Sequence, residues 1–224
     1  AALTETRSAI ASNSLRELAQ SQSLSSPRLV EHMRHYDTLI SSQEGILSQI
    51  VDGSTALRIH SVESHDDPII LDWVKFISNE YTSPEGLDDI LILLPCSARK
   101  PYSSSRSHRS FIRSMNHNAA HEVMVTSPLG LAPRDLEEVW PAGHYDIPVT
   151  GDWTMDEMAR VTQMLDSLVA RNNYRLIINH SGMDYESEIP IIDTRDGDSA
   201  TYHDALERLG KAVYDNVRVK RRSS

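Results

Sequence analysis

The chain has 224 residues, of which 39% are hydrophobic and 24% charged, and this composition excludes a wholly disordered protein. It carries 22 Lys and Arg against 32 Asp and Glu, a net charge of −10, which excludes general coating of nucleic acid through excess positive charge. The single cysteine, Cys96, excludes an intramolecular disulfide and a zinc site of several cysteines, and indicates a reducing compartment. No apolar run is long enough for a signal peptide or a membrane span, so we expect a cytoplasmic protein with no membrane partner.

The first fifty residues have the spacing of amphipathic helices. Apolar residues recur at near-helical intervals at positions 3, 10, 15 and 18, and again between residues 29 and 40. Neither stretch carries a chemical motif. We therefore interpret residues 1–52 as a helical segment that packs on another element.

From residue 57 onward, short apolar runs alternate with helical patterns. The predicted strands are residues 56–62, 90–94, 122–126, 145–150 and 175–179. The predicted helices are residues 68–81, with Asp66 or Asp67 as its cap, 107–116, 155–172, with Thr154 as its cap, and 201–215. Residues 133–139 are predicted to form a helical turn or two. This alternation predicts an α/β domain over residues 53–218 with a parallel sheet covered on both faces, followed by a basic tail at 219–224.

Three predicted strands end in unusual polar sequences. Cys96 follows the strand at 90–94, Ser127 follows the strand at 122–126, and His180 follows the strand at 175–179. Ligands of parallel α/β sheets bind beyond the carboxyl ends of the strands. If the three strands are parallel and adjacent, these side chains converge on one rim of the sheet.

Residues 90–121 contain no acidic residue, although the chain as a whole is acidic. They contain five basic residues: Arg99, Lys100, Arg106, Arg109 and Arg113. The serines of residues 103–107 precede a predicted helix start, where free backbone N–H groups favour anions. This combination favours a phosphate or anion site over a merely solvated surface. The basic residues at the terminus are interpreted as a flexible tail, with contact to an RNA backbone as the alternative.

Cys96 has two interpretations. One is a buried structural thiol; the other is a nucleophile whose pKa is lowered by Arg99 and Lys100 and whose base is His180. His108 and His180 are likewise either structural histidines or residues that line the site. His117 and His121 match no known ligand spacing, so we expect neither a metal ion nor an organic cofactor.

The string Pro-Cys-Ser-Ala-Arg-Lys-Pro-Tyr-Ser-Ser-Ser-Arg-Ser-His at residues 95–108 is long and specific. It resembles the signature of the archaeosine synthase family, paralogues of the archaeal tRNA-guanine transglycosylases. The strings at residues 126–137 and 140–151 match the same domain, and the resemblance covers residues 57–215. The first fifty residues resemble the helical tail of a transglycosylase-like barrel.

The resemblance implies a three-layer α/β sandwich with a short parallel sheet, similar to the uracil-DNA glycosylases. It implies a tRNA substrate whose D-loop carries 7-cyano-7-deazaguanine, and addition of an amine from lysine or glutamine to the nitrile. It also implies a radical enzyme that acts downstream on a lysine adduct. The signature falls on Pro95, Cys96, Ser97, Lys100, Pro101, Tyr102, Ser105, Ser107 and His108.

We assign catalytic roles to four residues: Cys96, Lys100, His108 and His180. Cys96 would add to the nitrile to give a thioimidate, and a histidine would move the protons. Substrate or RNA binding is assigned to Ser97, Arg99, Tyr102, Ser105, Arg106, Ser107, Arg109 and Ser127.

Family members also carry a transglycosylase-like barrel and an RNA-binding PUA domain. We expect both to be supplied by a partner chain or by the rest of a longer polypeptide, so that this chain is part of a tRNA-modifying transferase. The alternative is a non-catalytic module that binds tRNA or docks to a tRNA-ribosyltransferase. A base-excising glycosylase follows only from the analogy of fold.

Overall fold

The computed structural model describes residues 2–12, 14–23, 25–41, 57–58, 65–116, 119–146 and 153–217. Its centre is a five-stranded mixed sheet with the strand order β4-β3-β2-β6-β7. The strands are β2 (Ile90–Pro95), β3 (His121–Thr126), β4 (Gly130–Pro133), β6 (Leu176–Asn179) and β7 (Ile191–Asp193). The predicted α/β class is therefore confirmed.

The parallel part of the sheet is centred on β2. This strand pairs in parallel with β3 on one side and β6 on the other, and β6 pairs in parallel with β7. Leu93 lies opposite both Val123 and Asn179, so the three central strands end at the same edge. The fifth strand, β4, runs antiparallel to β3.

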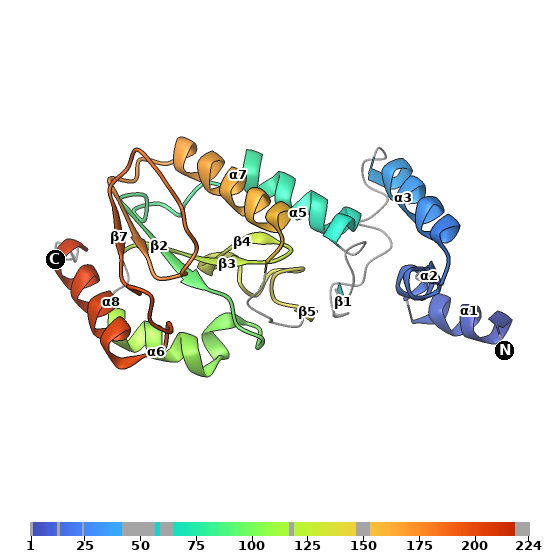
Figure 1. Ribbon diagram of the computed structural model, residues 1–224, viewed down its shortest axis with the longest axis horizontal. Helices are drawn as coiled ribbons and strands as arrows, with labels where there is room; N and C mark the ends of the chain where they lie inside the picture. The colour runs from blue at the N-terminus through green and yellow to red at the C-terminus, as the bar shows by residue number, and fades with distance from the viewer. Residues whose placement is uncertain are drawn as a thin grey trace.

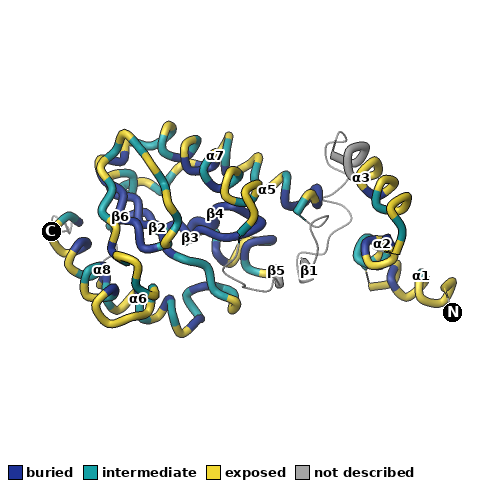
Figure 2. Tube along the Cα trace, in the orientation of Figure 1, coloured by how far each residue is buried: buried dark blue, intermediate teal, exposed yellow. Residues whose placement is uncertain are grey.

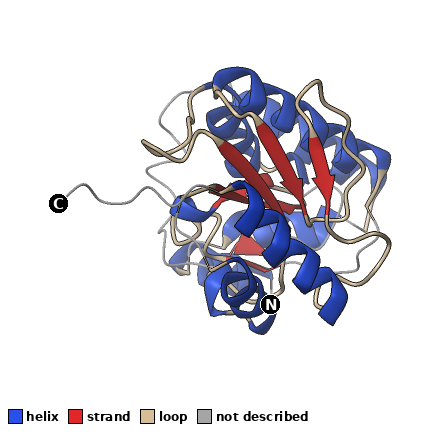
Figure 3. Cartoon of the chain, turned by 90° about the vertical axis from the view of Figure 1, so that its left-hand side faces the viewer, coloured by secondary structure: helices blue, strands red, loops and turns tan. Residues whose placement is uncertain are grey.

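Helices cover both faces of this sheet and complete a three-layer arrangement (Figures 1 and 3). Helices α5 (Pro68–Asn79) and α7 (Met155–Arg171) pack together on one face. Helices α6 (Arg106–Met115) and α8 (His203–Asn216) pack together on the other. Strands β2, β3, β4 and β6 are largely buried between them (Figure 2), and the aliphatic run of β2 lies in the middle of the core, whereas β7 is partly exposed.

The helices begin where the sequence supplies caps. Asp67 accepts a hydrogen bond from the backbone of Ile69 at the start of α5, and Pro68 occupies the first helical position. Thr154 and Glu157 form a reciprocal capping box at the start of α7. The predicted caps Asp67 and Thr154 are confirmed.

The sequence prediction missed two short strands, β4 and β7. The helical turn predicted within residues 133–139 is the 3₁₀ turn η3 (Arg134–Leu136), which follows β4. The turn of residues 127–129 returns the chain onto β3, and Gly130, whose φ is +75°, begins β4. Of the predicted strands at 56–62 and 145–150, β1 (Leu57–Arg58) and β5 (Tyr145–Asp146) pair in parallel, and the other residues lie outside those described.

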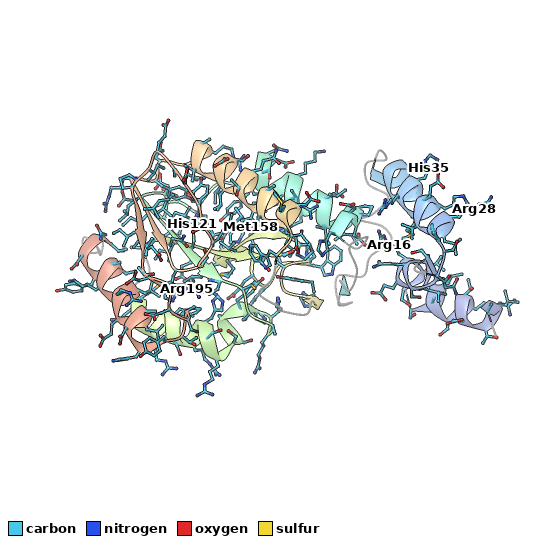
Figure 4. The ribbon with its side chains drawn as sticks, in the orientation of Figure 1. Arg16, Arg28, His35, His121, Met158 and Arg195 are labelled. Atoms are coloured by element: carbon cyan, nitrogen blue, oxygen red, sulfur yellow. The ribbon has the colours of Figure 1, made fainter. Side chains whose placement is uncertain are left out.

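The described residues of the amino-terminal segment form α1 (Ala2–Ala11), α2 (Leu15–Ser23) and α3 (Pro27–Ser41), and residues 42–52 lie outside those described. These helices lie to one side of the α/β body (Figure 1). Arg16 from α2 reaches the start of α5 (Figure 4), where its Nη1 lies 2.9 Å from the carboxylate of Asp67. The residue that caps α5 thus also attaches the helical segment to the sheet domain.

Among the described residues of the α/β body three histidines are buried, and both ring nitrogens of each are hydrogen-bonded. His121 bonds to the hydroxyls of Tyr81 and Tyr174, and His180 bonds to Thr194 Oγ1 and the Ala200 carbonyl. Burial lowers the pKa of both His121 and His180 to about 4. The third, His108, has a pKa of about 3, lowered first by burial and then by a neighbouring guanidinium. All three are therefore neutral in the folded protein at neutral pH.

The contact between α6 and α8 depends on a glycine. A Cβ added at Gly210 would lie 2.8 Å from the carbonyl oxygen of Ser114. We expect Gly210→Ala to force the helices apart and to lower the free energy of unfolding by about 1–3 kcal/mol, although alanine favours helix. Urea unfolding measures this change. The matched control is Lys211→Ala at the exposed neighbouring position, and equal stability of the two variants would contradict the prediction.

The buried histidines make stability depend on pH. Their folded pKa values of about 3 to 4 lie below the ordinary value of 6.5, so between these values the unfolded chain binds more protons. We expect the free energy of unfolding to fall by about 2–5 kcal/mol between pH 7 and pH 5. Urea unfolding at a series of pH values measures this change. His121→Gln should reduce the dependence of the unfolding free energy on pH, whereas His203→Gln, at an exposed position, should not. A flat profile from pH 7 to pH 5 would show the attribution to be wrong.

Candidate functional site

The ends of β2, β3 and β6 bring Cys96, Ser127 and His180 to one edge of the sheet, but their side chains have different surroundings. Cys96 lies beside Thr126 and Lys100. Ser127 Oγ donates to Glu157 at the start of α7. His180 packs edge-on against Phe111 and bonds to Thr194 and Ala200. The predicted convergence therefore holds for the strand ends and not for the side chains.

Cys96 is next to a cluster of three buried hydroxyl groups. Thr126 Oγ1 is hydrogen-bonded to the hydroxyl of Tyr145, and this hydroxyl is bonded to that of Tyr102. Thr126 Oγ1 also donates to the carbonyl of Ser127 at 3.4 Å. The elements that supply these groups are β2, β3, β5 and the 3₁₀ turn η2 (Tyr102–Ser104). We call Cys96, Lys100, Tyr102, Thr126 and Tyr145 the Cys96 cluster.

Lys100 places its ammonium group against the two aromatic rings. Its Nζ lies 4.1 Å from the ring centroid of Tyr145 and 5.1 Å from that of Tyr102. The same Nζ donates to the carbonyl of Ser97 at 2.8 Å. Cation–π attraction and this hydrogen bond hold the positive charge close to Cys96.

The prediction that the pKa of Cys96 is lowered by its basic neighbours is wrong in its net direction. Burial raises the pKa of the thiol, while Lys100 and the hydrogen bond from Thr126 offset part of that rise. Arg99 is exposed. The cysteine is consequently a protonated thiol at neutral pH.

His108 has a fixed tautomer. Its Nδ1 lies 3.0 Å from the guanidinium of Arg134, which can only donate, and its Nε2 lies 2.9 Å from the carbonyl of Pro95. Nδ1 is thus the acceptor, and Nε2 carries the proton and donates it to Pro95. Both nitrogens are engaged by the protein, so the geometry gives His108 the role of holding the backbone that leads into Cys96.

Arg134 connects this histidine to two carboxylates. It bonds to Glu122 through Nε at 2.9 Å and to Glu137 through Nη1 at 2.9 Å. Glu137 in turn accepts the backbone N–H of Ser103 at 2.9 Å. This network fixes the turn that carries Tyr102 and the start of α6.

His180 lies on the far side of Phe111 from His108. The ring centroids are 5.2 Å apart for His108 and Phe111, and 5.1 Å apart for Phe111 and His180. With both nitrogens bonded to Thr194 and Ala200, His180 has the contacts of a structural core residue rather than of a base for Cys96.

The serines and arginines assigned to RNA binding divide into two groups. Ser105 caps α6 by accepting the backbone N–H of His108, and it also contacts Ser107; Ser97 bonds to the Arg99 carbonyl. The side chains of Arg99, Arg106, Arg109 and Arg113 are exposed. Because residues 106, 109 and 113 recur at helical spacing, their side chains emerge on one side of α6.

Sequence reasoning missed four residues that build this site: Thr126, Arg134, Glu137 and Tyr145. All four lie in the two strings, 126–137 and 140–151, that the sequence analysis recognised but did not assign. Thr126 is the last residue of β3, so its position at a strand end was the available signal. No three His, Cys, Asp or Glu side chains of the described residues gather as a metal site, and no described helix is long and apolar enough to cross a membrane.

Comparison with known proteins identifies relatives of much greater length. Archaeosine synthase subunit alpha of Thermoplasma acidophilum is 43% identical over 124 residues, which are 54% of this chain and 24% of that protein. Archaeosine synthase of Haloferax volcanii is 37% identical over 180 residues, which are 80% of this chain and 30% of that protein. The chain thus spans less than a third of the length of these relatives.

The crystal structure of AF0587, a protein of unknown function, matches 63% of this chain and 49% of its own, with a TM-score of 0.49 and 24% identity. The family model described as domain of unknown function DUF5591 matches residues 70–213. This range is more than half of the chain and holds β2, α6 and the whole Cys96 cluster. The chain therefore belongs to the DUF5591 family of archaeosine synthase-related proteins.

Proposed function

We propose that this chain carries the part of an archaeosine-forming enzyme that adds an amine to the nitrile of 7-cyano-7-deazaguanine in the D-loop of tRNA. The observation that carries the proposal is the Cys96 cluster, in which a thiol, an ammonium group and three hydroxyls meet at the carboxyl edge of the parallel strands. The names of the relatives support the pathway. A fold similar to that of the uracil-DNA glycosylases is part of this proposal.

The chemistry begins with the thiol. The sulfur of Cys96 bonds to the nitrile carbon as one π bond of the nitrile breaks, and the thiol proton ends on the nitrile nitrogen. The product is a thioimidate. The donor amine then bonds to the same carbon, the carbon–sulfur bond breaks, and its electron pair returns to sulfur with a proton from the amine. The net result is an amidine and a regenerated thiol.

The neighbouring groups have separate tasks in this scheme. The Lys100 ammonium stabilises negative charge on sulfur and on the developing imide nitrogen. His108 keeps the Pro95 carbonyl, and with it the backbone at Cys96, in position. The donor amine, from lysine or glutamine, must be neutral when it attacks.

The exposed arginines of α6 supply a surface for tRNA. Arg106, Arg109 and Arg113 emerge on one side of a helix whose first turn lies next to the Cys96 cluster. Phosphate contacts from such side chains orient a folded RNA without reading its sequence. The transglycosylase-like and PUA parts of the relatives would bind the rest of the tRNA.

The first test is turnover of tRNA that carries 7-cyano-7-deazaguanine, with isotope-labelled lysine or glutamine, followed by mass spectrometry of the nucleosides. The chain is tested with and without the remaining segments of its relatives. We expect Cys96→Ala to reduce amidine formation at least about 1,000-fold and Lys100→Met to reduce it about 10- to 100-fold. Lys75→Met, at an exposed position of α5, should retain parental activity.

Two outcomes would overturn the catalytic proposal. Parental turnover by Cys96→Ala would remove covalent catalysis. Binding of the tRNA without any change in mass, with either donor and with all segments present, would favour the non-catalytic tRNA-binding module.

The arginine surface predicts a salt-dependent loss of binding. The tRNA-binding constant falls as salt rises, and each phosphate contact contributes slightly less than one to the steepness of log K against log salt. We therefore expect replacement of Arg106, Arg109 and Arg113 by Gln to make this slope about 2–3 less steep. Fluorescence anisotropy of labelled tRNA measures this slope, with Lys75→Gln as the control. An unchanged slope would place the tRNA on another face.

A further inference from the structure

The hairpin of β3 and β4 fixes the position of Arg134. The two strands pair antiparallel, and Val123 lies opposite Pro133. Arg134, the next residue, therefore comes beside Glu122. Its Nε and Nη2 both contact one carboxylate oxygen of Glu122, at 2.9 and 2.8 Å, and its Nη1 contacts Glu137 at 2.9 Å. Because the guanidinium group is planar, these contacts fix its orientation as well as its position.

The turn that carries Arg134 has a second attachment at the next residue. Asp135 accepts a hydrogen bond at 2.8 Å from the hydroxyl of Tyr81, which follows α5. That hydroxyl also lies 2.8 Å from Nε2 of His121, which is buried at the start of β3. The 3₁₀ turn η3 is thus held through two consecutive side chains, and the guanidinium extends from a fixed backbone.

One nitrogen of this guanidinium sets the position of the proton on a buried imidazole. Nη2 of Arg134 lies 3.0 Å from Nδ1 of His108, which is fully buried. Since a guanidinium only donates, Nδ1 keeps its lone pair and the proton stays on Nε2. With the proton on Nδ1 instead, the lone pair of Nε2 would face that of the Pro95 carbonyl, 2.9 Å away. Arg134 therefore selects the tautomer that binds Pro95.

The Pro95 carbonyl belongs to the peptide unit that leads into Cys96. Pro95 is the last residue of β2. A peptide unit is planar, so a hydrogen bond on its oxygen also orients the backbone nitrogen of Cys96. The Cα that carries the thiol is bonded to that nitrogen. The orientation of this peptide unit consequently sets where the sulfur lies.

We infer that Arg134 is a positioning residue for Cys96 and acts through His108. Its guanidinium sets the tautomer of the imidazole, and the imidazole orients the peptide unit that carries the thiol. The inference rests on the proposed function only for the nitrile as the group that the sulfur attacks. Neither Arg134 nor His108 transfers a proton in this role, because both act by orienting the attacking atom before it reacts.

Nitrogen NMR of the whole chain tests this link without tRNA. Cys96 is the only cysteine, so isotope labelling of cysteine nitrogen gives one amide signal, which reports on the peptide unit bonded to His108. Labelling of the histidine rings shows which nitrogen of each imidazole is protonated, and the His108 signals are those lost in His108→Gln. We expect the parent to carry this proton on Nε2. Arg134→Met should abolish the fixed tautomer and move the Cys96 amide signal.

Two substitutions of His108 test the same link with the ion pairs of Arg134 intact. Glutamine places an amide N–H about where Nε2 lies and donates to Pro95, whereas the shorter asparagine reaches Arg134 and not Pro95. We expect His108→Gln to keep the Cys96 amide signal near its parental position. His108→Asn should move the signal as Arg134→Met does.

The same variants separate positioning from binding in the proposed reaction. We expect Arg134→Met to lower kcat for amidine formation about 10- to 100-fold and to change KM for tRNA less than about twofold, because a misplaced nucleophile slows the chemical step. In the His108→Asn background, the further loss from Arg134→Met should be less than about threefold, since both changes break one link. The matched control is Arg175→Met, which removes an ion pair with Asp89 beside the amino end of β6 and should leave kcat and the Cys96 signal unchanged.

A parent protein whose His108 carries its proton on Nδ1 would overturn the inference. So would a folded Arg134→Met protein with the parental Cys96 signal or with parental kcat, folding being checked by circular dichroism. If Arg134→Met does not fold, the two His108 variants decide, and identical Cys96 signals in both would overturn the inference. If the signals move as expected while no protein, including the parent, acts on the nitrile, the positioning role stands and the proposed function fails.

Discussion

The parallel pairing of β2 between β3 and β6 is the constraint on which the rest of this structure depends. It places Leu93 opposite both Val123 and Asn179, and so brings three strand ends to one edge. The segments that leave this edge carry Cys96, Thr126 with Ser127, and His180. No sequence-local feature joins Cys96 to Thr126, thirty residues later. The sheet register does so, because parallel strands bring separate parts of the chain to one edge.

Features set by local chemistry were predictable from the sequence, and features set by long-range contacts were not. Asp67 before Pro68 and Thr154 before Met155 predict helix starts, because capping needs only residues within one turn. The aliphatic run of β2 predicts a buried strand. In contrast, β4 is defined by its return onto β3. The roles of His108 and His180 likewise depend on Arg134, Thr194 and Ala200, which lie 14 or more residues away.

The net charge of −10 describes the whole chain and does not show where the charged residues lie. The arginines differ in their contacts. Arg134 is engaged with Glu122, Glu137 and His108, and it holds the turn before α6. The arginines on the exposed side of α6 are available to solvent-borne anions. In the function that we propose, a cationic surface on an acidic body would favour selective docking of one folded RNA, because negative charge elsewhere repels phosphate.

The surroundings of Cys96 act on its pKa in opposite directions. Cys96 is half-buried, and burial disfavours the thiolate and raises the pKa of the thiol. The ammonium of Lys100 and the hydroxyl of Thr126 each offset part of that rise in the pKa. Lys100 is itself held by Ser97 and by the ring of Tyr145, and Thr126 by Tyr145. Tyr145 thus connects both compensating groups, although it comes from β5, a strand outside the main sheet. For this reason the placement of β5, and not the cysteine motif alone, sets the surroundings of the thiol.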